Sequence, residues 1–473
     1  MTSTELCNLP AVTLARLLRA REVSAREVVI AHLARVELHN GAINAIVTLT
    51  AEAALAEAAA ADERLARGDE VGPLHGLPVA HKDLHDTRGV RTTYGSKIFA
   101  DHVPDRDSLV VNRMKAAGAI TLGKTNTPEF GTGSQTYNAV FGVTRNPYDL
   151  SKTPGGSSGG AAAALAAGFI ALADGSDMGG SLRNPASYCN VVGLRPSPGR
   201  VPSYAGPTSW IQLAVEGPMA RTVADTALLL SVLAGDDVAS PLTGGPGVPD
   251  FAADLRQDQA GVRVGWTPVP TGLAVAPAVT AVLATRGWPA LQGLGVQLID
   301  VQPDFTGADR VFRTWRAYSY LLNFSDLLDE HRDELNADVV ANIEHGRAVT
   351  VGDLRAADEA RAGLWRQMAT LFEDIDFLVL PVSAVPPFSC DTAWPRSING
   401  VEQVSYLDWM RLAYWVSATG LPAISVPCGF TEDGLPIGMQ IVGPPRSELA
   451  LLRFAHAVEL ATGASSVRPP LAG

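Results

Sequence analysis

The stretch of residues 153–183, TPGGSSGGAAAALAAGFIALADGSDMGGSLR, constrains this chain more than any other. It holds two serine sites flanked by glycines, Ser157 within GGSSGG and Ser181 within DMGGS, separated by an alanine-rich run. Glycine lacks a Cβ, so each turn lets backbone N–H groups approach a bound molecule closely. Strong helix formers over residues 160–171 place the first turn at the N-terminus of a predicted helix, where free N–H groups favour negative charge. The stretch predicts a site for an anion, or for one that forms during a reaction.

The composition indicates a large globular protein. Hydrophobic residues make up 47% of the 473 residues and charged residues 18%, which supplies the apolar material of a large core. We expect a single α/β domain over residues 1–473, because large enzymes of this class often build one continuous core with insertions. We expect the core motifs of the site within residues 72–200, and a more variable region that supplies the substrate pocket over about 240–420.

Charge and cysteine usage narrow the partners and the compartment. The net charge is −12 and there is no basic run, so the chain lacks the footprint of a nucleic-acid binder and small molecules are the expected substrates. The four cysteines are scattered without a C-x-x-C pair, which favours a reducing cytoplasm over a disulfide framework or a structural zinc site. No window reaches the roughly 18 apolar residues of a membrane span, and no signal peptide is evident. We expect a cytoplasmic protein without a membrane partner.

Hydrophobic periodicity predicts alternating helices and strands. A capping box of Ser24 and Glu27 divides the helical region 13–36 into two helices. The segment 240–250, rich in Pro and Gly, is predicted to be a surface linker. Further predicted helices are 51–67, 108–117, 222–233 and 450–460, and predicted strands are 43–50, 77–80, 119–123, 191–194, 262–265, 296–301, 377–380, 425–429 and 438–442.

A lysine at the end of a predicted interior strand is the next informative residue. The apolar run 77–80 leads almost directly into Lys82. Burial would lower the pKa of this lysine, although most lysines are solvated surface charges and this segment alone leaves that interpretation open. His75, His81 and His85 lie nearby, but their spacing matches no zinc pattern, so no metal is expected.

The turn before Ser181 is suited to stabilise an oxyanion. Consecutive backbone N–H groups in DMGGS can converge near the Ser181 Oγ, which places an oxyanion hole beside a nucleophile. A serine nucleophile needs a base, yet none of the nine histidines lies in a motif that assigns it this role, and G-x-S-x-G is absent. Lys82 is the better candidate if burial lowers its pKa from about 10.4 to near neutrality. Ser157 can then pass the proton between Lys82 and Ser181.

Six segments together carry a resemblance to a known family. They are GLPVAHKD, PGGSSGG, GSDMGGSLRNPASYCNVVGLRPS, EGPMARTVAD, ATGLPAISVP and GLPIGMQIVGPP, and they extend along nearly the whole chain. Together they resemble the amidase signature family, which comprises serine hydrolases with a Ser-cisSer-Lys triad. The resemblance implies the family's fold, a single α/β domain with a central mixed β-sheet covered by α-helices on both faces.

The resemblance also implies a role for each motif residue. Ser181 is the implied nucleophile, Ser157 the relay in a cis peptide bond with Gly156, and Lys82 the general base and later the acid. Many members carry threonine where this chain has Met178, but that position acts through its backbone. No metal or cofactor is implied. The implied oxyanion-hole residues are Met178, Gly179, Gly180 and Ser181, and the implied supporting residues are Ser158, Asp177 and Arg183.

The expected activity is hydrolysis of amide C–N bonds through an acyl-enzyme on Ser181. Apolar or aryl amides are the expected substrates, with carbamates (urethanes) and esters as further candidates, as in aryl acylamidases or urethane-cleaving members.

Two alternatives remain: the glutaminase subunit of a tRNA-dependent amidotransferase, and a non-enzymatic binding protein. A phosphate-binding loop is disfavoured because G-x-x-x-x-G-K-[ST] is missing. The sequence leaves the oligomeric state open. Candidate substrate-pocket residues, from loop 130–138 and the aromatic-rich segment 394–415, are Phe130, Thr132, Gly133 and Trp415.

Overall fold

A mixed eleven-stranded β-sheet organises the computed structural model, which describes residues 1–242 and 248–471. β2 runs parallel to both of its neighbours, as does β9, and all other neighbouring strands of the sheet are antiparallel. From one edge to the other, the strands are β1 (Ile46–Leu49), β3 (Ile120–Thr125), β2 (Pro78–Lys82), β6 (Leu172–Asp177), β8 (Val215–Ala220), β7 (Val192–Arg195), β14 (Ala423–Phe430), β15 (Pro436–Val442), β11 (Phe377–Pro381), β9 (Arg263–Trp266) and β10 (Gln297–Asp300). The expected mixed α/β sheet is confirmed.

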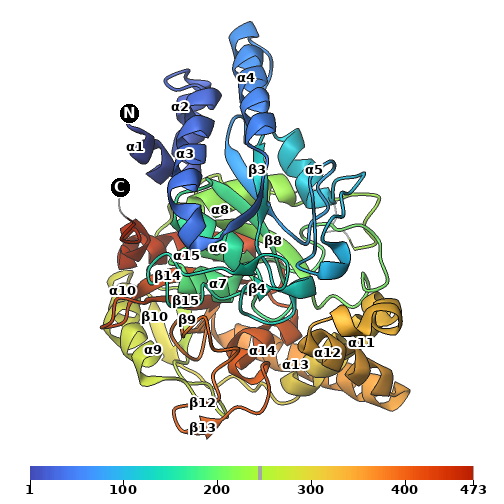
Figure 1. Cartoon of the computed structure of the whole chain (residues 1–473). Helices are drawn as coiled ribbons and strands as arrows, with labels where there is room; N and C mark the ends of the chain where they lie inside the picture. The colour runs from blue at the N-terminus through green and yellow to red at the C-terminus, as the bar shows by residue number, and fades with distance from the viewer. Residues whose placement is uncertain (243–247, 472–473) are drawn as a thin grey trace.

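Helices flank this sheet, and two short hairpins lie outside it (Figure 1). The hairpins pair β4 (Tyr137–Asn138) with β5 (Gly142–Val143), and β12 (Ser397–Ile398) with β13 (Val401–Glu402). Within the described part of the chain, no helix has the length and apolar character needed to cross a membrane. The α-helices are α1 (Ser3–Asn8), α2 (Ala11–Arg19), α3 (Ala25–Ile43), α4 (Ala51–Arg67), α5 (Leu109–Ala116), α6 (Gly159–Ala166), α7 (Arg183–Tyr188), α8 (Val223–Leu233), α9 (Pro277–Val282), α10 (Trp288–Gly293), α11 (Ala308–His331), α12 (Ala337–Ala348), α13 (Val351–Asp374), α14 (Arg411–Thr419) and α15 (Glu448–Thr462).

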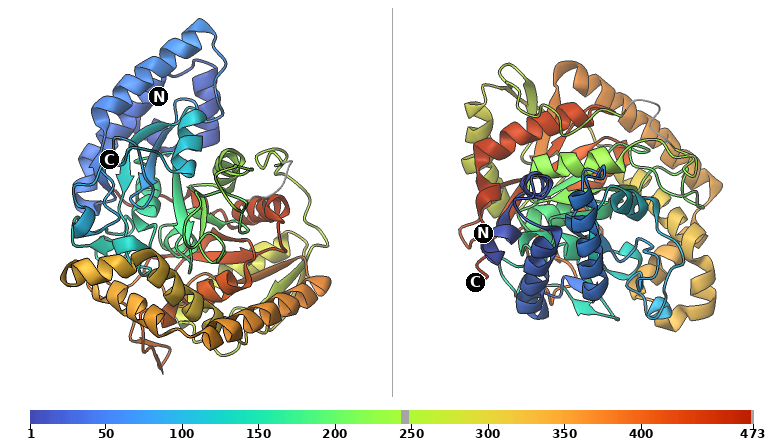
Figure 2. Two further views of the ribbon diagram at one scale, coloured as in Figure 1. Left: turned by 90° about the vertical axis from the view of Figure 1, so that its right-hand side faces the viewer. Right: turned by 90° about the horizontal axis from the view of Figure 1, so that it is seen from above.

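Two groups of helices lie at opposite ends of the molecule. Figure 2 shows the N-terminal helices α2 to α4 at one end and the three long helices α11 to α13 at the other. Both chain termini lie on the same side of the molecule. Since α11 packs against α12, α13 and α14, these four helices form one helical layer. The described part of the region 240–420 thus supplies this layer as well as the strands β9, β10 and β11 of the sheet.

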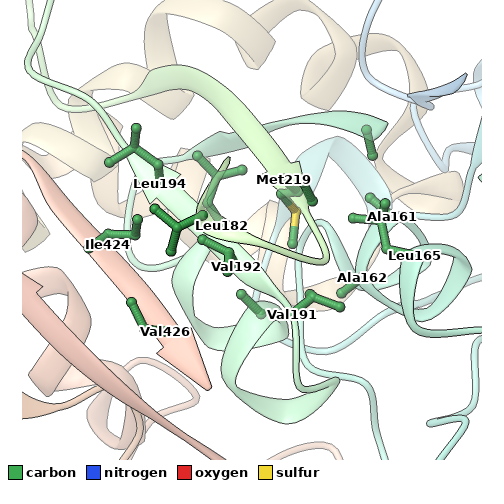
Figure 3. Packing of buried hydrophobic residues seen from close by; sticks show 14 of the residues in the cluster. Ala161, Ala162, Leu165, Leu182, Val191, Val192, Leu194, Met219, Ile424 and Val426 are labelled. Carbon is green, nitrogen blue, oxygen red and sulfur yellow. The ribbon is translucent and has the colours of Figure 1, made fainter. Parts of the chain in front are cut away.

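The alanine-rich helix α6 is buried along its whole length. Figure 3 shows Ala161 and Leu165 in the same buried cluster as Val192 of β7 and Ile424 of β14. Small side chains allow this close approach, and a Cβ at Gly160 would lie 2.3 Å from the backbone nitrogen of Asn126. Tight packing at the start of α6 therefore fixes the serine loop that precedes it.

Most predicted elements are present, with informative differences at their ends. The predicted helix 51–67 coincides with α4, and the predicted capping box of Ser24 and Glu27 begins α3. The predicted strand 43–50 is shorter, because α3 extends to Ile43 and ends at Asn44 in the left-handed conformation. The predicted helix 160–171 ends at Ala166, since Gly168 with a φ of +72° breaks it before β6. Part of the predicted linker, residues 243–247, lies outside the described residues.

Candidate active site

Lys82 ends the buried strand β2 and is itself fully buried. Its Nζ lies 2.8 Å from the Ser157 Oγ and 3.0 Å from the Ser176 Oγ. Burial lowers the pKa of Lys82 from 10.5 to about 7, although the negative charges of Glu216 and two aspartates act in the opposite direction. Near neutral pH a large fraction of this amine is uncharged, so it can accept a proton.

The serine loop lies between β5 and α6 and is tied to the turn that holds Ser181. The Gly156–Ser157 peptide bond is cis. Ser134 donates a hydrogen bond to the carbonyl of Gly156 at 2.6 Å. The backbone N–H of Ser158 donates to the carbonyl of Ser181 at 3.2 Å, which joins the two serine sites directly. The structure therefore brings Lys82, Ser157 and the Ser181 turn together, although 99 residues separate Lys82 from Ser181 in the sequence.

Asp177 organises the turn before Ser181. Its carboxylate accepts hydrogen bonds from the Arg183 Nε at 3.0 Å and Nη2 at 2.9 Å, and it pairs with Arg195 at 3.4 Å. All three side chains are fully buried. Burial alone would raise the pKa of Asp177, but the two guanidinium groups hold it well below its usual range. The aspartate is therefore ionised and fixes the turn through charge-assisted bonds.

The backbone of the turn differs in one respect from the expected set of four donors. The Gly180 N–H donates to Asp177 at 2.8 Å and so points away from a ligand. The N–H groups of Met178, Gly179 and Ser181 have no hydrogen-bond acceptor among the described residues. Gly180 adopts a φ of +109°, which turns its amide inward. Three amides, rather than four, are thus available to bind an oxyanion.

A second ionic cluster, which the sequence did not reveal, surrounds Lys82. Asp174 accepts hydrogen bonds from the His81 Nδ1 at 2.5 Å, the His85 Nδ1 at 2.7 Å and the Lys82 backbone N–H at 2.9 Å. The His85 Nε2 donates to Glu216 at 2.6 Å. Burial would lower the pKa of His85, but the carboxylates of Glu216 and Asp174 raise it to about 10. His85 is therefore a charged link between two carboxylates beside the lysine.

The candidate pocket loop lies beside Ser157. A Cβ at Gly131 would lie 3.3 Å from the Ser157 Oγ. Its neighbour Phe130 stacks on Phe324 with ring centroids 4.6 Å apart. On the other side, the Thr132 Oγ1 lies 2.8 Å from the hydroxyl of Tyr320. The loop thus connects the serine site to side chains of α11.

The other two candidate pocket residues lie in different surroundings. Gly133 is next to Tyr406, whose ring would lie 3.9 Å from a Cβ at this position. The Trp415 Nε1 donates to Asp309 at 2.7 Å, and its ring lies 5.4 Å from that of Phe305. Trp415 lines a separate hollow with these residues, whereas Gly133 belongs to the loop at the serine site.

A cavity of about 210 Å³ opens next to the turn of residues 177–181, called the oxyanion turn below. Met178 of the turn and Glu216 of the ionic cluster both line it. Ser319 and Asn323 of α11 and Gln212 also face this space. Its lining combines polar side chains such as Glu216 and Asn323 with apolar ones such as Met178 and Leu213, so a bound molecule has both hydrogen-bonding groups and apolar contacts within reach.

Lys82 is a buried amine of lowered pKa in contact with Ser157, and Ser181 lies in a turn with three free backbone amides. This arrangement is suited to a serine hydrolase with a lysine base. The Amidase family model matches residues 27–452, and the chain belongs to this family of amidase signature enzymes. Membership makes it an amide hydrolase by class.

Three relatives show how far the similarity extends. The chain is 37% identical to a glutamyl-tRNA(Gln) amidotransferase subunit of Moorella thermoacetica, with 99% of each chain covered. It is 36% identical to an acylamidase of Rhodococcus erythropolis, with 96% of each covered. The solved structure of a bacterial aryl acylamidase superimposes with a TM-score of 0.90 at 29% identity, covering 98% of this chain and 99% of that one.

Proposed function

We propose that this protein hydrolyses the C–N bond of apolar or aryl amides through an acyl-enzyme on Ser181, and that carbamates and esters of similar shape also react. The observation that carries the proposal is the contact of 2.8 Å between the buried Lys82 amine and the Ser157 hydroxyl. With a pKa of about 7, the amine accepts a proton at neutral pH without a histidine. It acts as a hydrolase without a partner chain.

The proposed proton route begins at this contact between Lys82 and Ser157. Neutral Lys82 takes the proton of Ser157 while Ser157 takes that of Ser181, and the Ser181 Oγ attacks the substrate carbonyl carbon. The oxyanion accepts hydrogen bonds from the amides of Met178, Gly179 and Ser181. Protonated Lys82 then returns the proton to Ser157, and the Ser157 hydroxyl gives its proton to the departing amine nitrogen as the C–N bond breaks. Water attacks the acyl-enzyme by the same relay, which releases the acid and restores Ser181.

The aromatic surroundings of the serine loop support an apolar substrate. Phe130 stacks on Phe324 and meets Phe99 edge-on at 6.2 Å. Such rings provide a large apolar surface. Phe130 is the sequence neighbour of Gly131, and a Cβ at Gly131 would lie 3.3 Å from the Ser157 Oγ, so this surface lies near the serine site. The similarity to an acylamidase and to an aryl acylamidase agrees with this preference.

A substrate panel tests the proposal. It contains a p-nitroanilide, a small aliphatic amide, an aryl carbamate and glutamine, each assayed with wild type, Lys82→Ala and Ser181→Ala. We expect wild type to cleave the anilide or the carbamate and both variants to be inactive while still folded. Turnover of the small polar amides alone would reject the apolar substrate class.

The similarity to an amidotransferase subunit defines the second candidate. In that role, the protein would hydrolyse glutamine and would depend on partner chains. Cleavage of glutamine alone would favour that function. Folded wild type that cleaves nothing would instead leave a binding role.

A further inference from the structure

Arg316 of α11 is a buried cation that pairs with no carboxylate of the described residues. Arg316 is only 5% exposed to solvent. Its Nε donates to Asn342 at 3.1 Å, and its Nη2 donates to the hydroxyls of Tyr320 and Tyr406, each at 2.9 Å. Its Nη1 lies 3.3 Å from the Met178 Sδ. Among the described residues, no carboxylate oxygen comes within 4.0 Å of this guanidinium.

Other buried arginines near the site are neutralised. Arg183 and Arg195 both pair with Asp177. A guanidinium loses its hydration on burial, and an opposite charge normally compensates for that loss. The charge of Arg316 acts on Asp338 and opposes the rise in its pKa, but the two side chains form neither an ion pair nor a hydrogen bond. The direct contacts of the guanidinium are instead neutral groups, including the rings of Tyr320 and Tyr406, whose centroids lie 4.6 Å and 5.9 Å from its Cζ. Cation–π contacts stabilise this charge, but no carboxylate of the described residues pairs with it.

Arg316 and the residues that contact it form a cluster, the Arg316 cluster, in which some hydrogen-bond donors lack a strong acceptor. Thioether sulfur is a weak acceptor, so the Met178 contact leaves the Nη1 hydrogens of Arg316 available to a better acceptor. The Tyr406 hydroxyl accepts hydrogen bonds from both Arg316 and Asn342, at 2.9 Å and 2.7 Å. Its own hydrogen has no acceptor among the described residues. An anion placed here would receive hydrogen bonds from both side chains.

This cluster touches both halves of the candidate active site. Met178 is part of the oxyanion turn, three residues before Ser181. Tyr320, which accepts from Arg316, lies 2.8 Å from Thr132 on the loop beside Ser157. One helical turn along α11, Ser319 lines the cavity together with Met178. Arg316 thus lies directly behind Met178, one of the residues that line this cavity.

We propose that Arg316, with the Tyr406 hydroxyl, binds a carboxylate of the substrate, so that the preferred amides carry a carboxylate a few atoms from the scissile carbonyl. The planar guanidinium fork matches the two oxygens of a carboxylate, and the substrate would supply the carboxylate partner that the described residues lack. This inference rests on the proposed amide hydrolysis and narrows its substrate class. The aryl or apolar part of the substrate still faces the Phe130 cluster, and the carboxylate faces Arg316.

Two matched substrate pairs test the assignment. One pair, glutaryl and pentanoyl p-nitroanilide, places the carboxylate on the acyl side, and the other, 4-acetamidobenzoate and 4-acetamidotoluene, places it on the amine side. We expect wild type to favour the carboxylate member of one pair by roughly 10- to 100-fold in kcat/KM, the range for hydrogen bonds to a charged group. Arg316→Met should remove this preference mainly through KM, and Arg316→Lys should retain part of it. Arg310→Met, which removes an exposed arginine of the same helix, should leave the preference unchanged.

The outcomes separate the carboxylate subsite from a purely structural role. Equal losses on both members of a pair in Arg316→Met, or no preference in wild type, would overturn the assignment. If wild type cleaves none of the four substrates, the proposed hydrolysis fails instead, and glutarate binding decides the subsite. Calorimetry should then show glutarate binding to Ser181→Ala and its loss in the Ser181→Ala, Arg316→Met double variant. Absence of glutarate binding to Ser181→Ala would overturn the inference.

Discussion

Replacing Gly180 with alanine tests whether the turn before Ser181 acts through its backbone geometry. A Cβ at Gly180 would lie 2.5 Å from the Ala413 Cβ and 2.7 Å from the Asn184 Nδ2. Because carbon atoms pack at about 3.5–4.0 Å, the turn must move by about 1 Å. A displacement of that size costs about 10²-fold in rate, and losing one oxyanion donor costs about 10²–10³-fold. We therefore expect kcat on a cleaved anilide to fall about 100- to 1000-fold.

The assay compares kcat, KM and the thermal unfolding midpoint with those of a matched glycine variant. Gly41→Ala is the control, since a Cβ at Gly41 of α3 has no atom within 4 Å. It should retain wild-type activity. A Gly180→Ala protein that keeps more than about a tenth of wild-type kcat would refute the backbone argument, because the turn would then tolerate the displacement.

Three further predictions concern the charges and the proton route. Because Lys82 must be neutral to act as a base, kcat/KM should rise with pH through a midpoint near its pKa of about 7. Glu216→Gln removes a charge that raises this pKa, so the midpoint should move to lower pH. A midpoint at higher pH in the pH-rate profile of Glu216→Gln would contradict this. Asp177→Asn leaves Arg183 buried without its charged partner and should lower the free energy of unfolding by about 3–5 kcal/mol in denaturant titrations; an unchanged midpoint of unfolding would count against it. Ser157→Ala interrupts the proton route and should lower kcat by at least about 100-fold with little change in KM, and steady-state kinetics that show only a raised KM would assign Ser157 to binding.

Local sequence signals were sufficient for many elements of the fold. The run of residues 51–67 contains strong helix formers without a breaker, and Gly68 follows it in the left-handed conformation, so α4 has the predicted bounds. The strand β6 was not predicted, because LADGSD shows neither alternation nor a continuous apolar run. Its pairing with β2 and β8 makes it a strand, and that pairing is a tertiary contact.

The candidate site was predictable where chemistry lies in short motifs. Lys82 is the last residue of the buried strand β2, and its burial and lowered pKa agree with the expectation from the sequence. The ionic cluster was not predictable, since 89 residues separate His85 from Asp174 and 131 separate it from Glu216. The inward turn of the Gly180 amide depends on a backbone angle that the GG dipeptide permits but does not specify.

Covalent labelling of the nucleophile tests the central claim most directly. The protein is incubated with p-nitrophenyl acetate and quenched in acid, and the acyl group is located by peptide mass spectrometry in wild type and in Ser181→Ala. We expect one acetyl group on the peptide that contains Ser181 and none in the variant, because in the proposed mechanism Ser181 is the nucleophile and the three free amides of the turn stabilise the oxyanion. Acetylation of Ser157, or equal acetylation of the Ser181→Ala protein, would contradict the assignment of Ser181 as nucleophile.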